Sequence, residues 1–169
     1  MLLGNLTFFF DLPFFKVTKS TCIIKVLLYI CTCKIQAIFN AITQSVQEWW
    51  GNTDSVSSKL DDEFTTSFGK TFWKFKIVEL KRNSKIVWEC IDAKHIHAGY
   101  DGIEKEWIGT KVEWFLEVKS QNETILNFVH NGLVPELNCY EICWPAWKRF
   151  ATQSLKNFVE TGKGMPHLS

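Results

Sequence analysis

Apolar and polar residues alternate along most of the chain after residue 50, and this pattern predicts a run of antiparallel strands. The clearest case is residues 111–119, in which every second residue from Val112 to Val118 is apolar and the intervening ones are mostly charged. Alternation with a period of two is typical of a strand with one buried and one solvated face. The same pattern predicts strands at residues 64–68, 73–77, 86–90 and 126–130. Residues 92–105 are mostly polar, carry Gly99 and Gly102, and are predicted to form a long loop.

Helical spacing of apolar residues occurs at both ends of this strand region. Residues 34–43 predict a helix, and residues 44–50 a short second one that stops at Gly51. Residues 140–160 predict one long helix, with Gly162 just after it in a typical stop position. Residues 23–33 form a β-branched, apolar run before the first helix and predict another strand.

The predicted order is a strand, two short helices, several antiparallel strands and one long C-terminal helix, which is an α+β arrangement. A sheet with one apolar face must be covered, and only the last helix is long enough to lie across it. If the sheet is strongly bent, the helix and the sheet cannot touch everywhere. We therefore predict a cavity between them, within one domain that begins near residue 22.

The composition adds an unusual aromatic content to this picture. The chain has 169 residues, of which 15% are aromatic, including 8 Trp and 14 Phe. Several inward Trp residues favour an incompletely filled interior, because each buried indole N–H needs a partner. The formal net charge of +1 excludes nucleic-acid binding by bulk attraction, which requires clustered Lys and Arg.

The N-terminal region and the cysteines bear on the compartment. Residues 1–22 are apolar but interrupted by Asp11 and Pro13, and no run reaches the ~20 residues that cross a bilayer. We treat residues 1–22 as an apolar extension, and whether it belongs to the mature protein is left open. The six cysteines contain no C-x-x-C pair. Free buried thiols are favoured, which predicts a cytoplasmic protein. The short apolar runs predict no stable membrane insertion.

Five short blocks carry a resemblance to a known family: F-N-A-I-T with E-W-W at 39–50, V-W-E-C at 87–90, E-W-I-G-T at 106–110, F-V-H-N-G at 128–132, and S-L-K with E-T-G-K-G-M-P at 154–166. Together they resemble the START-like superfamily, also called SRPBCC. Within it, they resemble small proteins related to the C-terminal domain of the heat-shock chaperone ATPase activator. The resemblance covers residues 23–169. Residues 1–22 have no counterpart in the family, and residues 55–62 lack a Gly-Gly that often precedes an early strand.

This resemblance implies a helix-grip fold, in which a curved antiparallel sheet wraps around a long C-terminal helix with two short helices after the first strand. Members bind lipids, hormones or polyketides in an apolar cavity. Some members are cyclases, and the chaperone-linked ones act in the stress response through a protein surface.

The predicted function is therefore the binding of a small hydrophobic molecule in an aromatic-lined cavity, without catalysis and without a cofactor. The predicted ligand-binding residues share an inward position on the strands or the helices: Trp50, Phe64, Trp73, Phe75, Trp88, Trp114, Phe128, His130, Trp147 and Ala151. Two alternatives stay open. One is a chaperone-activator-like interaction domain with a heat-shock chaperone as its partner, and the other is a cyclase or hydrolase that uses His130.

Candidate chemistry centres on histidine and cysteine. A buried His130 can act as a general base, but a core histidine satisfied by neighbouring groups is favoured. Cys90, His95 and His97 do not form the closely spaced, closed set of four that a structural zinc site requires. We predict that both loop histidines are solvated. Cys139 and Cys143 lie one helical turn apart, so that they can contact a metal or each other, but simple packing is favoured. No catalytic residue and no metal site are predicted.

Overall fold

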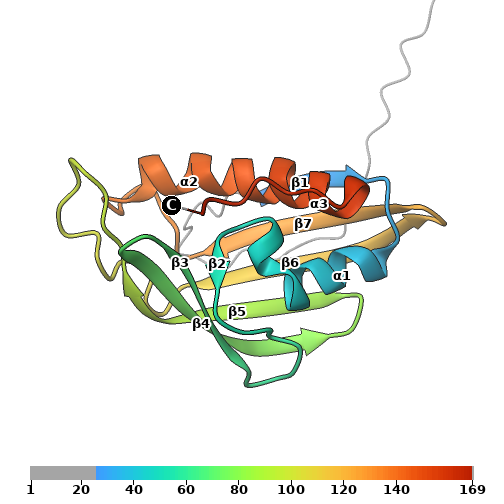
Figure 1. The fold of residues 1–169 in the computed structure, drawn as a ribbon, viewed down its shortest axis with the longest axis horizontal. Helices are drawn as coiled ribbons and strands as arrows, with labels where there is room; N and C mark the ends of the chain where they lie inside the picture. Colours follow the sequence, from blue (N-terminus) through green and yellow to red (C-terminus); the bar gives the residue numbers. More distant parts are fainter. Residues whose placement is uncertain (1–25, 169) are drawn as a thin grey trace, which may run out of the picture.

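The computed structural model describes residues 26–168, with side chains described from residue 32 onward. A seven-stranded antiparallel sheet is crossed by one long C-terminal helical segment (Figure 1). The strands are β1 (Val26–Cys31), β2 (Asn52–Thr53), β3 (Glu63–Phe68), β4 (Thr71–Lys81), β5 (Lys85–Lys94), β6 (Lys111–Ser120) and β7 (Glu123–Asn131). They lie in the order β1-β7-β6-β5-β4-β3-β2. The predicted extension at residues 1–22 lies outside the described residues.

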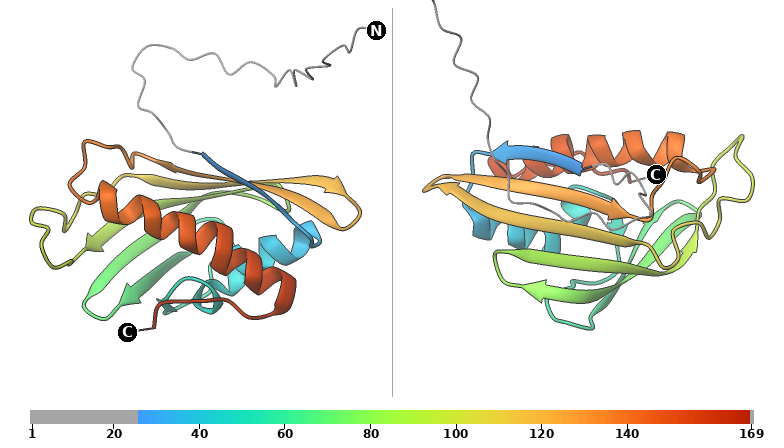
Figure 2. Two further views of the ribbon diagram at one scale, coloured as in Figure 1. Left: turned by 90° about the horizontal axis from the view of Figure 1, so that it is seen from above. Right: turned by 180° about the vertical axis from the view of Figure 1, so that it is seen from behind.

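The helices lie on one side of this sheet. They are α1 (Ile35–Gln44), the 3-10 turn η1 (Val46–Glu48), α2 (Tyr140–Arg149), the π-helical turn η2 (Phe150–Ser154) and α3 (Leu155–Thr161). α2, η2 and α3 are consecutive and run diagonally across the sheet (Figure 2). Gly162 ends the segment with a left-handed backbone at φ 78°, as a helix-stop glycine should. The predicted long helix at 140–160 is thus confirmed, with one π turn in its middle.

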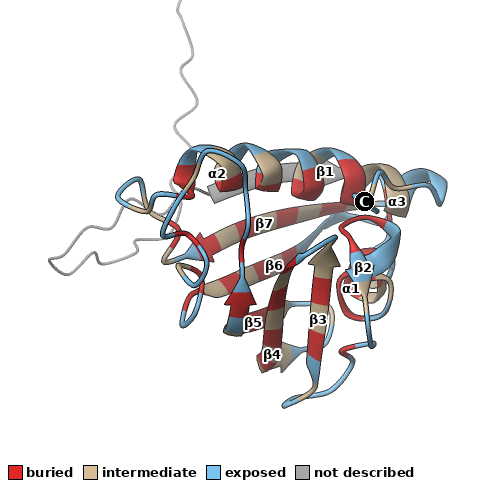
Figure 3. Ribbon diagram, turned by 60° about the vertical axis from the view of Figure 1, so that its left-hand side comes forward, coloured by how far each residue is buried: buried red, intermediate tan, exposed pale blue. Residues whose placement is uncertain are grey.

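Side-chain burial alternates along the strands, and the alternation separates a core face from a solvated face (Figure 3). In β4 the residues from Thr71 to Ile77 are buried at every second position. β6 and β7 pair so that Trp114 lies opposite Phe128, and both side chains are completely buried. On the solvated face, ion pairs such as Lys74–Glu63 at 2.6 Å cross between neighbouring strands. The α+β helix-grip fold expected from the resemblance is confirmed.

Some local predictions differ from the structure. Residues 44–50 contain a single 3-10 turn instead of a second helix, and the short strand β2 was not predicted. Strand β5 extends to Lys94, three residues into the region predicted as loop. Val118 is 60% exposed, although its place in the alternation predicted an inward position, because the end of β6 projects beyond the cover of the helices.

The cysteine prediction is confirmed only in part. Cys90, Cys139 and Cys143 are free and buried, as expected, whereas Cys33 is disulfide-bonded. The expectation of a free thiol is therefore wrong for Cys33. Within residues 26–168, no helix combines the length and the apolar character that a membrane crossing requires.

Candidate functional site

A cavity of about 410 Å³ lies beneath α2, at the end of the sheet where β4 and β5 meet the loop before β6. Exposed residues, among them Ile96, His97 and Arg149, contribute to its lining, so the cavity reaches the surface. Its inner walls are aromatic and come from five separate segments of the chain: Trp50, Phe68, Trp73, Trp107, Trp147 and Phe150. A space of this size falls within the range of small-molecule sites in proteins.

The indole rings hold one another in place along the inner wall. Trp73 stacks on Trp107 with ring centroids 4.6 Å apart, and Trp107 stacks on Trp147 at 5.8 Å. Trp50, which follows η1, packs against Trp147 at 4.7 Å and brings the α1 side of the molecule into the same wall. Rings that pack at such distances gain stabilisation beyond the area they bury. The wall is therefore largely formed before any ligand arrives.

The ten residues predicted to contact a ligand divide into two groups. Trp50, Trp73 and Trp147 line the cavity. The other seven are buried in the core behind it: Phe64, Phe75, Trp88, Trp114, Phe128, His130 and Ala151. Trp114 lies edge-on to Trp88 at 5.3 Å and to Trp147 at 6.1 Å, so this half of the interior is filled by interlocking rings.

Sequence reasoning missed several lining residues, of which Trp107 is the most prominent. It lies between β5 and β6 in a segment without strand periodicity, and only 4% of its surface is exposed. Phe68 and Phe150 were also missed as lining residues. The block E-W-I-G-T at 106–110, which carried part of the family resemblance, was the one signal that pointed to Trp107.

His130 lies at the centre of a chain of buried hydrogen bonds. Its Nδ1 accepts a hydrogen bond from the indole N–H of Trp147 at 2.9 Å, and its Nε2 lies 2.9 Å from the Thr110 hydroxyl. Thr110 donates to the Trp107 carbonyl at 2.6 Å. Burial lowers the pKa of His130 to about 3, so the ring is neutral at physiological pH. Both ring nitrogens are engaged, as expected for a satisfied core histidine.

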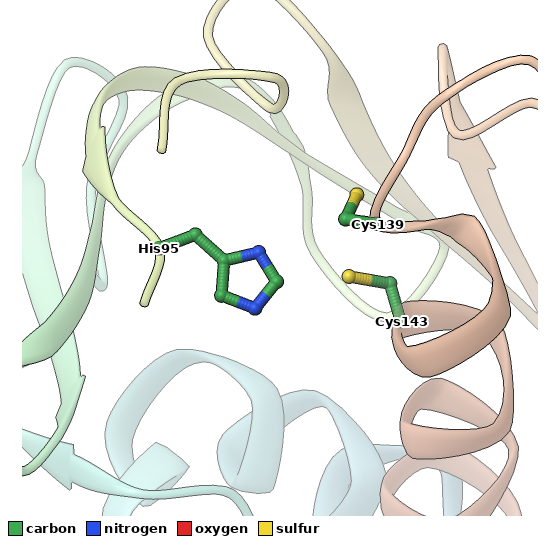
Figure 4. Close-up of side chains that lie close together, drawn as sticks. All are labelled: His95, Cys139 and Cys143. Carbon is green, nitrogen blue, oxygen red and sulfur yellow. The ribbon is translucent and has the colours of Figure 1, made fainter. Parts of the chain in front are cut away.

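A second polar cluster lies at the edge of the cavity and joins two distant parts of the chain. His95 follows β5, and Cys139 and Cys143 belong to the start of α2 (Figure 4). One ligand-capable atom from each of these three buried residues lies within 4.8 Å of the other two. The prediction that His95 is solvated is wrong, because only 6% of its surface is exposed; His97 is exposed, as predicted. The loop after β5 folds back under α2 and carries His95 inward.

Glu106 fixes the start of α2 beside this cluster. Its carboxylate accepts hydrogen bonds from the backbone N–H of Asn138 at 2.9 Å and from the backbone N–H of Cys139 at 2.8 Å. Burial raises the pKa of Glu106, but these backbone hydrogen bonds outweigh it and lower the pKa below its usual value. Unpaired N–H groups at a helix start are thus satisfied by a carboxylate from the loop.

The two thiols influence each other strongly. Hydrogen bonding to Cys143 lowers the pKa of Cys139 to about 6, against the opposing effect of burial. The same hydrogen bond raises the pKa of Cys143, and burial adds to that rise. These directions describe a thiolate at Cys139 that accepts a hydrogen bond from the Cys143 thiol, which keeps its proton.

Solved structures with the same architecture come from several organisms. The Aha1 dimer from Colwellia psychrerythraea matches with a TM-score of 0.67 and 23% identity, over 84% of this chain and 99% of that one. An HSP90 activator from Plasmodium falciparum matches with a TM-score of 0.58 and 18% identity, over 83% of this chain and 96% of that one.

A third match comes from a biosynthetic locus. A protein of the dynemicin locus matches with a TM-score of 0.61 and 16% identity, over 82% of this chain and 48% of that one. No protein-family model and no curated protein sequence matches the chain. The curved sheet, the crossing helix and these neighbours together show that the chain has a helix-grip fold, similar to that of the Aha1 dimer and the HSP90 activator.

Proposed function

We propose that the protein binds a small, largely apolar molecule in the cavity beneath α2. The observation that carries this proposal is a space of about 410 Å³ walled by Trp50, Trp73, Trp107 and Trp147 in a preformed arrangement. Transfer of an apolar surface from water to such a wall contributes about 25 cal/mol per Å². A ligand with few polar groups therefore gains most from this site.

The mouth of the cavity differs from its interior and suggests how a ligand is oriented. Arg149, His97 and His167 lie at its exposed end, whereas the indole rings lie deeper. A guanidinium at the mouth favours a molecule with an anionic or strongly polar end. We propose that the apolar body enters first and that the polar end stays near Arg149.

The test uses two fluorescent apolar probes and two variants in which an alanine is replaced by phenylalanine. Anilinonaphthalene sulfonate carries a negative charge, and phenyl-naphthylamine is neutral. Ala146 lines the cavity from α2, so Ala146→Phe should fill space that the probe needs. Ala37 lies on the exposed side of α1, and Ala37→Phe adds the same group to another helix without touching the cavity.

We expect saturable binding of both probes to the wild type and to the Ala37→Phe variant, with tighter binding of the anionic probe. The Ala146→Phe variant should lose at least about 90% of the affinity, because the ring occupies the site. No saturable binding to the wild type, or equal binding to both variants, would contradict the proposal. Native mass spectrometry of protein purified from its source then identifies the natural ligand.

A second candidate function is an interaction with a heat-shock chaperone. The specific observation in its favour is that the neighbours in fold include an Aha1 dimer and an HSP90 activator. Stimulation of a purified chaperone's ATPase tests it, and the absence of both stimulation and complex formation would contradict it. Ala146→Phe separates the two functions, because it blocks the cavity and leaves the outer surface of the sheet intact.

Catalysis by His130 has less support than either of these. Its two nitrogens are both engaged in hydrogen bonds, and the ring lies behind the wall of the cavity. A general base must present a free lone pair to the proton it abstracts. We also propose a cytoplasmic location, on the ground that Cys90, Cys139 and Cys143 keep free thiols. The disulfide at Cys33 is the observation that opposes this location.

A further inference from the structure

The cluster of His95, Cys139 and Cys143 has the donor atoms and the spacing of a metal site. One imidazole nitrogen and two sulfurs lie within 4.8 Å of one another, and all three residues are buried. For three atoms with this maximum separation, at least one point lies within about 2.8 Å of all three. Zinc bonds to cysteine sulfur at about 2.3 Å and to histidine nitrogen at about 2.0–2.1 Å. To coordinate one ion, the sulfurs thus need to move inward by at most about 0.5 Å and the nitrogen by at most about 0.8 Å.

The surroundings of the cluster also indicate that a partner belongs there. The Nδ1 atom of His95 is buried and has no hydrogen-bond partner among the described residues. A buried polar nitrogen without a partner is costly and is rare in native proteins. His95 packs against Trp73 with ring centroids 5.0 Å apart, which fixes the imidazole in its position facing the two thiols. A metal ion would satisfy the imidazole and both sulfurs at once.

We propose that His95, Cys139 and Cys143 form a three-ligand zinc site whose fourth coordination position faces the cavity. His95 and Cys143 both line that cavity, so a ligand completing a tetrahedron approaches from its interior. Three protein ligands with one open position are typical of reactive zinc sites, whereas closed sets of four are typical of structural ones. Water takes the fourth place.

The donor chemistry selects the ion. Two thiolates and an imidazole suit zinc, and they exclude magnesium and calcium, which require oxygen ligands. The protein also supplies rigidity at both ends of the site. Glu106 holds the backbone of Cys139, and the backbone N–H of His95 donates to the carbonyl of Glu104 at 3.0 Å. The loop before β6 therefore acts as a frame that keeps the histidine opposite the helix start.

The test is a titration of the full-length protein with Co²⁺ and then with Zn²⁺, after a chelator has removed any metal. Oxygen is excluded to keep Cys139 and Cys143 as thiols, and no reductant is added, so that the disulfide of Cys33 stays closed. We expect one equivalent of Co²⁺ to produce the visible bands of a tetrahedral ion and a near-ultraviolet band from thiolate-to-cobalt charge transfer. Zinc should displace the cobalt stoichiometrically. No apolar molecule is added, so this result does not depend on whether the cavity binds one.

Matched variants identify the ligands. Cys139→Ser, Cys143→Ser and His95→Gln should each weaken zinc binding by more than about 100-fold, measured by competition with a chromophoric chelator. Cys90→Ser removes a buried thiol outside the cluster, and His97→Gln removes the histidine two residues away. Both of these control variants should bind zinc as the wild type does.

The outcomes separate clearly. Weak or absent zinc binding to wild-type protein with free Cys139 and Cys143 thiols would overturn the proposal, and so would cobalt spectra without thiolate bands. Tight binding of Cu⁺ without binding of zinc would overturn the choice of ion. A control variant that loses affinity as much as the ligand variants would place the metal elsewhere. If a ligand variant fails to fold, the cobalt spectrum of the wild type still decides between thiolate coordination and its absence.

Discussion

At the scale of single residues, the protonation of His130 follows from its partners. An indole N–H can only donate, so the Nδ1 that faces Trp147 must carry a lone pair. The proton of the neutral ring therefore lies on Nε2 and is donated to the Thr110 hydroxyl, which in turn donates to the Trp107 carbonyl. A second proton on His130 would remove the acceptor of the Trp147 hydrogen bond inside the core.

This arrangement predicts an acid-sensitive stability. The pKa of His130 falls from 6.5 in the unfolded chain to about 3 in the folded protein, because burial disfavours the charged ring. Below pH 6.5 the unfolded state binds a proton that the folded state does not, so the free energy of unfolding decreases as the pH falls. Between pH 7 and pH 5 we expect a loss of about 2 kcal/mol from this residue. Urea denaturation across that range measures it.

The control is His130→Gln, whose amide can accept from Trp147 and donate to Thr110 without titrating. The variant should be less stable than the wild type at pH 7, and the difference should shrink toward pH 5. All other titrating groups are common to both proteins and cancel in the comparison. A difference that stays constant over this range would show that the pKa of His130 is not depressed in the folded protein.

The sequence did not predict that His95, Cys139 and Cys143 lie close together. The spacing of Cys139 and Cys143 by one helical turn was visible, and so was His95 in a polar loop. Their meeting depends on the path of a loop that has no periodicity, and the alternation of neighbouring strands does not encode that path. A prediction of solvation for His95 was reasonable from local polarity, and the return of the loop beneath α2 made it wrong.

At the scale of elements, α2 begins with a cap that comes from another part of the chain. Residue Cys139 occupies the cap position and makes no side-chain hydrogen bond there. Glu106, from the loop before β6, accepts the helix-start hydrogen bonds in its place. Glu106→Ala leaves these N–H groups unpaired, and we expect it to lower the free energy of unfolding by about 1–2 kcal/mol.

Chemical denaturation of the metal-free protein measures this loss, so that zinc does not contribute to it. Glu104→Ala is the matched control, because Glu104 is exposed and lies two residues away in the same loop. Its effect should stay within about 0.5 kcal/mol. Equal stabilities of the two variants would show that the backbone of α2 finds its cap elsewhere.

The C-terminal tail is a second element held by distant contacts. Ser154 donates to the Trp49 carbonyl at 2.6 Å and accepts from the Met165 N–H at 2.6 Å, which fastens the tail to the turn after α1. Gly164 passes so close to this turn that a Cβ atom would lie 2.0 Å from the Glu48 carbonyl oxygen. We expect Gly164→Ala to destabilise the protein by about 1–3 kcal/mol, measured by thermal unfolding.

Lys163→Ala provides the comparison for the tail, since that side chain is exposed and its carbonyl, which accepts from Asn157, is retained. It should unfold at nearly the wild-type temperature. If Gly164→Ala does so as well, the tail does not dock against the turn in solution.

The elements that the sequence predicts well are those with a regular period. The strand predicted at residues 111–119 and the helix predicted at 140–160 each have one buried face, which gives the sequence a regular apolar pattern. Both predictions are confirmed. Strand β2 has two residues, too few for any period, and exists because β3 offers it a pairing edge. The tail likewise has no pattern of its own, because its contacts are mainly backbone hydrogen bonds and one close approach at a glycine.

At the scale of the whole molecule, the aromatic residues serve two purposes that the alternation cannot separate. Trp114 and Trp73 both occupy inward positions on strands. Trp114 is completely buried and meets the rings of Trp49, Trp88 and Phe128. Trp73 lies at the other end of the sheet, with one side against Trp107 and another on the cavity. Which inward rings border an open space depends on where the helix and the loop stand away from the sheet.

This division predicts opposite effects of the same substitution at the two sites. Trp114→Leu should cost about 3–5 kcal/mol of stability, because it opens a hole in a filled region. Trp73→Leu should cost less, since part of its ring faces space already open. In probe binding the order reverses. In Trp73→Leu, the loss of about 55 Å² of contact between probe and ring removes about 1.4 kcal/mol of binding free energy, which is a tenfold weaker affinity. Trp114→Leu, where it is folded, should bind the probe as the wild type does.

Denaturation of Trp114→Leu and Trp73→Leu measures which variant loses more stability, and probe titration measures which loses more affinity. Equal loss of binding in the two variants, with Trp114→Leu still folded, would mean that the ligand lies along the middle of the sheet. The cavity beneath α2 would then be only its entrance, and the seven core residues predicted to contact a ligand would regain that role. The same residues face inward whether the ligand is confined to the cavity beneath α2 or lies along the middle of the sheet. Only denaturation and probe titration together therefore distinguish a filled core with a cavity at one end from a channel that runs along the sheet.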